Sequence, residues 1–230
     1  LGLISLLLLL SQAVKFTTAM FSPWQESVKV ARTRWNADYN FNIVILAKGI
    51  SLLSFNPQKE TITTVDIPQN VYLEVPNGFG MWLMSSIYNL GESQQMGGGQ
   101  LLKNTLVNQF GLPIDGFLQF SGEYSRKETA VIISEIRKDP FSLARVLPYL
   151  KTDLTPVELI RLKMGLSRVR FDKIEQIDLK ALDVLQKDKL ADGTDILTMD
   201  TIKLEPQLSA FKDTSLQTEN KTIAIFNSTD

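Results

Sequence analysis

Three strand-like runs between residues 41 and 66 constrain the fold of this chain more than any other feature of its sequence. Residues 41–46 and 50–55 are short apolar runs with the length of buried strands. The turn residues 56–59 separate the second run from residues 60–66, a stretch rich in β-branched side chains. Strands that follow one another this closely predict a sheet at the centre of the fold.

Helix signals follow these runs and alternate with further strands. The Thr-Pro-Val-Glu sequence at 155–158 has the spacing of a capping box, and Val157, Ile160 and Met164 share one face of the helix that it begins. Further helices are predicted at 81–90, 100–110 and 140–150, further strands at 71–75, 116–120 and 173–178, and a polar loop at 188–195. This order predicts an α/β/α layered fold: one central mixed sheet flanked by helices and preceded by an N-terminal hydrophobic helix.

The composition removes several classes of chemistry. The chain has 230 residues, no cysteine and no histidine, which excludes disulfides, thiolate or imidazole metal sites and histidine acid–base catalysis. Its net charge of −1 argues against a strongly basic nucleic-acid binder, so we expect no nucleic acid among its partners.

The charge is distributed unevenly along the chain. Residues 126–173 carry 11 basic and 6 acidic groups, whereas residues 61–125 carry 1 and 5. The positive segment is either a surface for an anionic ligand or a solvated helix surface.

The two ends of the chain are expected to lie outside the central α/β domain. Residues 1–14 contain a leucine run typical of a truncated transmembrane or signal helix, and residues 15–40 resemble a membrane-proximal connector. If residues 1–14 are such a helix, we expect a single N-terminal anchor in the cell membrane and the bulk of the chain outside the cytoplasm. We expect an α/β domain at 41–180, a linker with a short helix at 181–219, and the first strand of a truncated further domain at 220–230.

Isolated motifs say little about chemistry. Gly97-Gly98-Gly99 precedes a helix and either presents backbone N–H groups to a phosphate or forms a helix-entry turn. The carboxylates available for acid–base work are Asp66, Glu74, Asp115 and Glu123, and none lies in a distinctive pattern.

Four segments in the expected order resemble the LytR-CpsA-Psr family: 42–76, 98–115, 151–162 (KTDLTPVELIRL) and 223–229 (IAIFNST). The last resembles the opening of the LytR C-terminal domain. The resemblance implies an anchored extracytoplasmic domain, with a hydrophobic cavity for a lipid tail. It also implies transfer of cell-wall glycopolymers from a polyprenyl-pyrophosphate carrier, with arginines on the pyrophosphate and aspartates on Mg²⁺.

The chain departs from the family where that chemistry resides. The resemblance places an Arg and an Asp of the family at Gln69 and Asn70, and a further Asp at Lys48. We therefore expect a degenerate active site with no catalytic residue and no metal. The candidate anion-binding residues are Lys48, Arg126 and Lys127, near the mouth of an apolar pocket beneath the segments 81–90 and 101–110.

Two functions remain open. The first is a non-catalytic binding or scaffold module of the cell envelope, without a cofactor, whose partners are membrane lipid and a polyprenyl phosphate carrier or cell-wall glycopolymer. The second is a divergent glycopolymer transferase acting on polyprenyl-pyrophosphate-linked polymers, which alone would require Mg²⁺.

Overall fold

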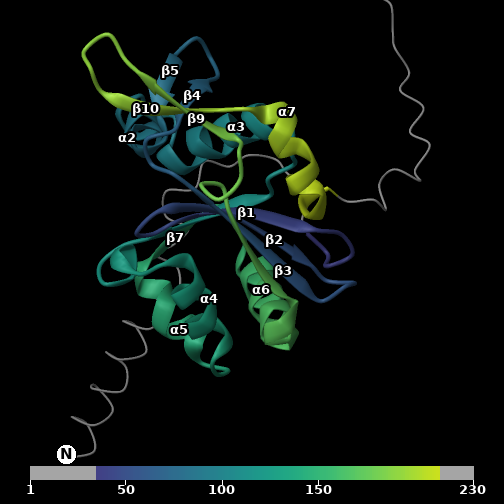
Figure 1. The fold of residues 1–230 in the computed structure, drawn as a ribbon. Helices are drawn as coiled ribbons and strands as arrows, with labels where there is room; N and C mark the ends of the chain where they lie inside the picture. The colour runs from purple at the N-terminus through teal and green to yellow at the C-terminus, as the bar shows by residue number, and fades with distance from the viewer. Residues whose placement is uncertain (1–34, 213–230) are drawn as a thin grey trace, which may run out of the picture.

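A six-stranded mixed sheet forms the centre of the protein (Figure 1). The structure is a computed structural model and describes residues 35–212. The strands lie in the order β7-β6-β1-β2-β3-β8. Their bounds are β1 Phe41–Leu46, β2 Ile50–Asn56, β3 Thr61–Ile67, β6 Gly116–Phe120, β7 Leu150–Thr152 and β8 Ile174–Asp178. The antiparallel pairs are β1–β2, β2–β3 and β6–β7, and the parallel pairs are β1–β6 and β3–β8.

Alternation along the strands builds two separate cores. Successive side chains of a strand point to opposite faces, so Val44 and Leu52 belong to one core while Ile43 and Leu53 belong to the other. All four are fully buried. The central strands are therefore apolar on both faces, which explains why they appear as nearly continuous hydrophobic runs.

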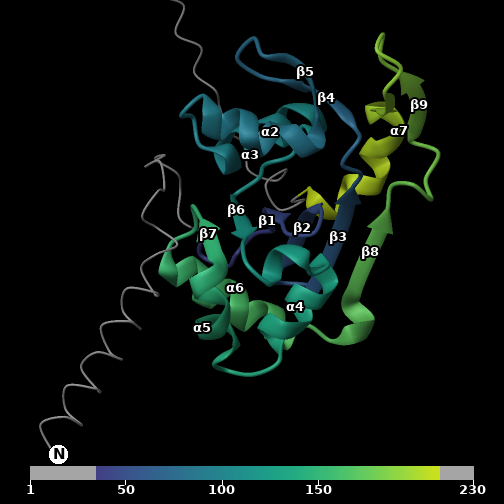
Figure 2. The same ribbon diagram turned by 90° about the vertical axis from the view of Figure 1, so that its left-hand side faces the viewer.

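The first core is covered by what we call the α2–α3 layer, on the upper side of the sheet in Figures 1 and 2. It comprises α2 Met84–Ser93, α3 Gly98–Phe110, the hairpins β4 Tyr72–Val75 with β5 Gly80–Leu83 and β9 Leu185–Lys189 with β10 Asp195–Met199, and the segment α7 Thr201–Leu204 with the 3₁₀ helix η5 Glu205–Phe211.

The second core is covered by what we call the α4–α6 layer, on the lower side of the sheet (Figures 1 and 2). Residues 126–173 supply most of this layer and the edge strand β7. Its helices are α4 Thr129–Arg137, α5 Ser142–Val146 and α6 Pro156–Arg168, with the 3₁₀ helices η2 Tyr124–Arg126, η3 Leu147–Tyr149 and η4 Phe171–Lys173.

Trp35 fixes the chain where it enters this second core. Its ring is fully buried and stacks on Phe41 with 4.3 Å between ring centroids. Its backbone N–H donates to Glu158 Oε1 (3.0 Å), and Arg161 donates to its carbonyl oxygen (2.7 Å). The first described residue is thus held against α6.

The predicted α/β architecture, with a mixed sheet flanked by helices, is confirmed, whereas several local expectations need correction. The segment 81–90 is divided between β5 and α2, and 140–150 breaks into α5 and η3 before β7 begins. Residues 188–195 form the end of one strand, a turn and the start of the next, because β9 and β10 pair as a hairpin. The sequence prediction also missed α4.

The exposed face of α6 is a further correction. Val157, Ile160 and Met164 do share a face, but about half of each residue's surface is accessible to solvent. The buried face is formed by Leu159, Leu162 and Leu166. Both sets recur at helical spacing, so periodicity alone does not distinguish them.

The expected N-terminal helix at 1–14 and the strand at 220–230 lie outside the described residues. No helix within residues 35–212 combines the length and the apolar character needed to cross a membrane. Part of the predicted linker packs onto the first core, where Leu204, Leu208 and Phe211 are buried. The domain boundaries themselves stay predictions.

Candidate functional site

Three of the positions singled out from the sequence lie together at one end of the sheet. Lys48 lies in the turn between β1 and β2, Gln69 follows β3, and Lys127 precedes α4. The Lys48 backbone N–H donates to the Lys127 carbonyl oxygen (3.2 Å), and the Gln69 side-chain amide donates to the Lys48 carbonyl oxygen (3.0 Å). The fold therefore brings together residues that are up to 79 positions apart. We call these residues, with Arg126 and Asn70 beside them, the motif edge.

Carboxylates already accompany two of the three cations at the motif edge. Lys48 Nζ lies 2.6 Å from Glu128 Oε1. Lys127 Nζ donates to both oxygens of Glu135 (2.8 and 2.9 Å) and lies 4.0 Å from the centroid of the Tyr124 ring. The hydrogen bond to Glu135 raises the pKa of Lys127. An anion at this edge would have to compete with Glu128 and Glu135 for these ammonium groups.

Arg126 differs from the two lysines. It is exposed at the end of η2, and within the described part of the chain no salt bridge occupies its guanidinium. A guanidinium fork matches phosphate oxygens well, so Arg126 is the most accessible cation for a phosphate here.

A carboxylate that the sequence did not distinguish lies at the same end of the sheet as the motif edge. Asp66 accepts hydrogen bonds from the Ser51 hydroxyl (2.5 Å) and the Gln176 amide (2.6 Å), and the Ser51 hydroxyl lies 2.8 Å from that of Thr129. Ser51 and Asp66 face each other in the β2–β3 register. From the sequence, their contact could have been predicted only by aligning the two strands in this register.

The side chains at the motif edge do not fit a magnesium ion. Mg²⁺ favours carboxylate oxygens, whereas Lys48 is a cation and Gln69 and Asn70 are neutral amides. Asp66 is held by two neutral donors. Among residues 35–212, no group of three or more acidic side chains is placed to hold a metal ion. The absence of a cofactor stays a prediction.

The glycine triplet before α3 forms a tight helix entry. The Gly98 backbone N–H already donates to Glu92 Oε1 (2.6 Å). A Cβ built on Gly98 would lie 2.4 Å from the Tyr88 carbonyl oxygen, and one on Gly99 would lie 2.5 Å from the Phe117 ring. These contacts favour the helix-entry interpretation: the glycines permit close packing of α3.

An apolar cavity lies between the sheet and the α4–α6 layer. It is narrow, about 20 Å³, which is little more than one water molecule needs. Its lining comes from the central strands and from α4, α5 and α6, with Lys163 as the charged member. The sequence had placed an apolar pocket beneath 81–90 and 101–110, on the opposite face of the sheet.

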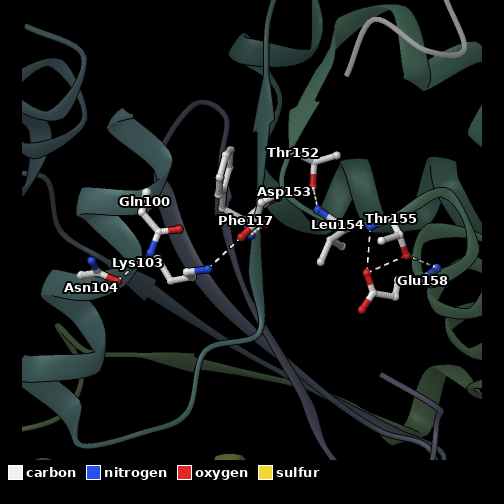
Figure 3. Close-up of polar contacts among 9 residues, drawn as sticks. All are labelled: Gln100, Lys103, Asn104, Phe117, Thr152, Asp153, Leu154, Thr155 and Glu158. Atoms are coloured by element: carbon white, nitrogen blue, oxygen red, sulfur yellow. Dashed lines mark hydrogen bonds and ion pairs between the residues drawn. The ribbon is translucent and has the colours of Figure 1, made fainter. Parts of the chain in front are cut away.

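A buried ion pair joins the two layers at one side of the sheet (Figure 3). Lys103 of α3 lies 2.7 Å from Asp153, which precedes α6, and their side chains are only 8% and 11% exposed. The other oxygen of Asp153 accepts from the Phe117 backbone N–H (2.8 Å). The sequence named neither partner as paired.

Solved structures share this arrangement of strands and helices. The crystal structure of TagT from B. subtilis matches with a TM-score of 0.54 and 15% sequence identity, over 82% of this chain and 97% of that chain. A structure of the LytR-CPS2A-psr family protein TagT with bound octaprenyl pyrophosphate lipid matches with a TM-score of 0.54 and 15% identity, over 80% and 95%. This chain has the LytR-CpsA-Psr fold.

The likeness extends to a further solved structure at a similar level. A transcriptional regulator from Enterococcus faecalis matches with a TM-score of 0.57 and 12% identity, over 75% of this chain and 86% of that chain. No protein-family model and no curated protein matches the sequence. At these identities the shared feature is the LytR-CpsA-Psr fold.

Proposed function

We propose that this protein is a membrane-anchored, extracytoplasmic cell-envelope protein that binds a polyprenyl phosphate carrier or its cell-wall glycopolymer without transferring the polymer. Structures with the same fold hold an octaprenyl pyrophosphate lipid and LIIa-WTA. The apolar cavity beneath the α4–α6 layer has a volume of about 20 Å³, so a prenyl chain would bind there only if the layer moved away from the sheet. The membrane address rests on the leucine run at residues 1–14.

The observation that carries the non-catalytic part of this proposal is the chemistry of the motif edge. Phosphoryl transfer depends on cations that converge on the phosphates and usually on a metal held by carboxylates. Here Lys48 and Lys127 are paired with Glu128 and Glu135, and amides stand at positions 69 and 70. Function follows the site rather than the fold.

The second candidate is a divergent glycopolymer transferase of the polyprenyl-pyrophosphate type. Asp66 favours it, because this carboxylate lies at the same end of the sheet and contacts the hydroxyl of Ser51. In that case Asp66 would be the group to test, Arg126 and Lys127 would hold phosphate oxygens, and Mg²⁺ would be required.

Calorimetric titration of the full chain with a polyprenyl phosphate, with and without Mg²⁺, tests the proposal. We expect saturable binding that Mg²⁺ changes by less than about twofold. The double variant Arg126→Ala, Lys127→Ala should bind about tenfold more weakly, which corresponds to about 1.4 kcal/mol. The matched control is Lys187→Ala, an exposed lysine on β9 on the opposite layer, which should bind like the wild type.

Two results would count against the proposal. A chain that fails to bind the lipid, or binds it equally well without Arg126 and Lys127, excludes the proposed phosphate-binding role of these residues. Mg²⁺-dependent release of polyprenyl pyrophosphate from a glycopolymer-linked substrate, lost in Asp66→Asn, would establish the transferase instead.

A further inference from the structure

The two sides of the sheet differ in charge. Residues 126–173, which form the α4–α6 layer, carry 11 basic and 6 acidic groups, a net charge of +5. Residues 61–125 carry 1 basic and 5 acidic groups, and residues 174–212 carry 5 and 8. The latter two segments supply the α2–α3 layer together with strands β3, β6 and β8 of the sheet, so this side of the molecule is negative and the other side is positive. We propose that the outer face of the α4–α6 layer is a membrane-contact surface that lies on an anionic lipid bilayer.

Exposed apolar side chains are concentrated on the same layer. Within residues 35–212, eleven large hydrophobic residues are exposed, and seven of them belong to residues 126–173: Val131, Phe141, Tyr149, Val157, Ile160, Met164 and Phe171. Exposed apolar side chains that lie side by side, rather than singly, mark an interaction surface. Three of the seven form the exposed stripe of α6 described above.

Cations flank that apolar stripe. Arg168 continues it one turn beyond Met164, Arg161 lies on one side, and Lys163 lies on the other. The one carboxylate of α6, Glu158, is buried and accepts hydrogen bonds from Trp35 and Thr155. A helix with an apolar stripe bordered by Lys and Arg is typical of one that lies in a membrane interface.

Acidic groups near the stripe are few and peripheral. Glu60, at the β2–β3 turn, lines a groove of about 240 Å³ beside Met164 and Arg168. Asp172 accepts from Arg170 (3.1 Å). Glu60 therefore offsets part of the positive charge beside the stripe. Within α6 itself, the cations Arg161, Lys163 and Arg168 are accompanied only by Glu158, which is buried.

The described part of the chain begins beside α6. This favours a membrane as the partner of α6, because the apolar run at residues 1–14 is connected to the domain at this helix. The Trp35 backbone is hydrogen-bonded to the side chains of Glu158 and Arg161 of α6. Residues 15–34 therefore tether α6 to the apolar run at 1–14, and 20 residues span at most about 70 Å. This step rests on the proposed function, because it takes the apolar run as a membrane anchor. A short tether raises the effective concentration of the surface at the bilayer.

Site-specific labelling tests the inference, because the wild-type chain has no cysteine. The full chain carrying Met164→Cys is labelled with an environment-sensitive fluorophore and reconstituted with phosphatidylglycerol-containing or purely phosphatidylcholine vesicles. The matched control is Met81→Cys, a similarly exposed methionine on β5 of the opposite layer (51% and 45% exposed; Figure 1).

We expect the label at 164 to become at least threefold less accessible to an aqueous quencher on anionic vesicles, and the label at 81 to be unchanged. The shielding should diminish on neutral vesicles and at high salt, because lipid phosphates attract the flanking cations. Adding Ile160→Asp and Arg168→Glu to Met164→Cys should abolish it, with circular dichroism as the check that the fold persists.

Other outcomes overturn the inference. A label at 164 that is shielded without vesicles shows that residues 1–34 or a second copy cover the face, and sedimentation distinguishes these. Equal shielding at 81 and 164 also contradicts it. If the chain floats with vesicles while position 164 stays accessible, the membrane-contact surface is refuted and the proposed membrane anchor is retained. If the chain does not float, both proposals are refuted. Loss of polyprenyl phosphate binding with shielding intact refutes only the proposed lipid ligand.

Discussion

The α2–α3 layer and the α4–α6 layer cover opposite faces of one sheet, and alternate residues of the same strands support them. Their buried sides are alike, since both cores consist of Ile, Leu, Val and Phe side chains. Their outer sides differ: one layer is acidic, whereas the other is basic and exposes most of the large hydrophobic residues of the described chain. The comparison shows that the core establishes the fold while the outward-facing side chains differentiate the two surfaces.

Packing against the sheet differs as well. On the α2–α3 side, Gly98 and Gly99 let α3 approach Tyr88 and Phe117 more closely than any larger residue could. On the α4–α6 side, the helices leave a narrow apolar cavity above the central strands. The α2–α3 side is therefore packed closely through its glycines, whereas the α4–α6 side retains a void of about 20 Å³.

The largest effect should come from breaking the link between the layers. Lys103→Ala leaves Asp153 buried without its cation, and we expect a loss of about 3 kcal/mol in the free energy of unfolding. Urea denaturation followed by fluorescence measures it. The control is Lys48→Ala, which removes the exposed pair with Glu128 and should cost less than about 1 kcal/mol.

If Lys103→Ala and Lys48→Ala lower the free energy of unfolding equally, burial of the Lys103–Asp153 pair does not increase its contribution to stability. A double variant, Lys103→Met with Asp153→Asn, removes both charges and should recover part of the stability, since no uncompensated charge remains.

A smaller effect, confined to one layer, should follow from Thr155→Ala. The Thr155 hydroxyl accepts from the Glu158 backbone N–H, and the Glu158 carboxylate accepts from the Thr155 backbone N–H. Losing this capping box should cost about 1 kcal/mol. Hydrogen exchange should accelerate in α6 and stay unchanged in α3, and Thr155→Ser should retain most of the stability. Equal acceleration in α3 would contradict the separation of the layers.

The smallest effect concerns a surface charge of the α4–α6 layer. The hydrogen bond from Arg145 holds the pKa of Asp139 below its ordinary value. The pair therefore stabilises the fold above the unfolded-state pKa, and this contribution is lost as pH falls through the folded-state pKa. Carboxyl NMR titration should show the Asp139 midpoint rising in Arg145→Ala.

Glu205 of the opposite layer provides the control for that titration. Lys212 lowers its pKa in the same way, and its midpoint should not respond to Arg145→Ala. A response at Glu205, or none at Asp139, would contradict the assignment of Arg145 as the partner.

Much of the fold was predictable from local signals. The runs 41–46, 50–55 and 116–120 are strands, and the capping box at Thr155 does begin α6. Such signals operate within a few residues, through backbone hydrogen bonds and side-chain alternation. The prediction was wrong where two elements share a short apolar stretch, as with β5 and α2, because the periods of helix and strand cannot be separated there.

The position of the candidate site was predictable from the sequence, but the ion-pair and hydrogen-bond partners of its side chains were not. Lys48, Gln69 and Lys127 were named from the resemblance to the LytR-CpsA-Psr family, and the fold brings them together. Their partners were not foreseen: Glu128 lies 80 residues from Lys48, and Ser51 meets Asp66 only through strand register.

The sequence by itself determined the alternation of the strands, the caps of the helices and the uneven distribution of charge. The tertiary structure decided which of the two helical stripes of α6 is buried, which carboxylate neutralises each lysine, and which layer holds the cavity. The physical reason is that the local signals require only neighbouring residues, whereas burial and ion pairing depend on how distant elements dock against the sheet.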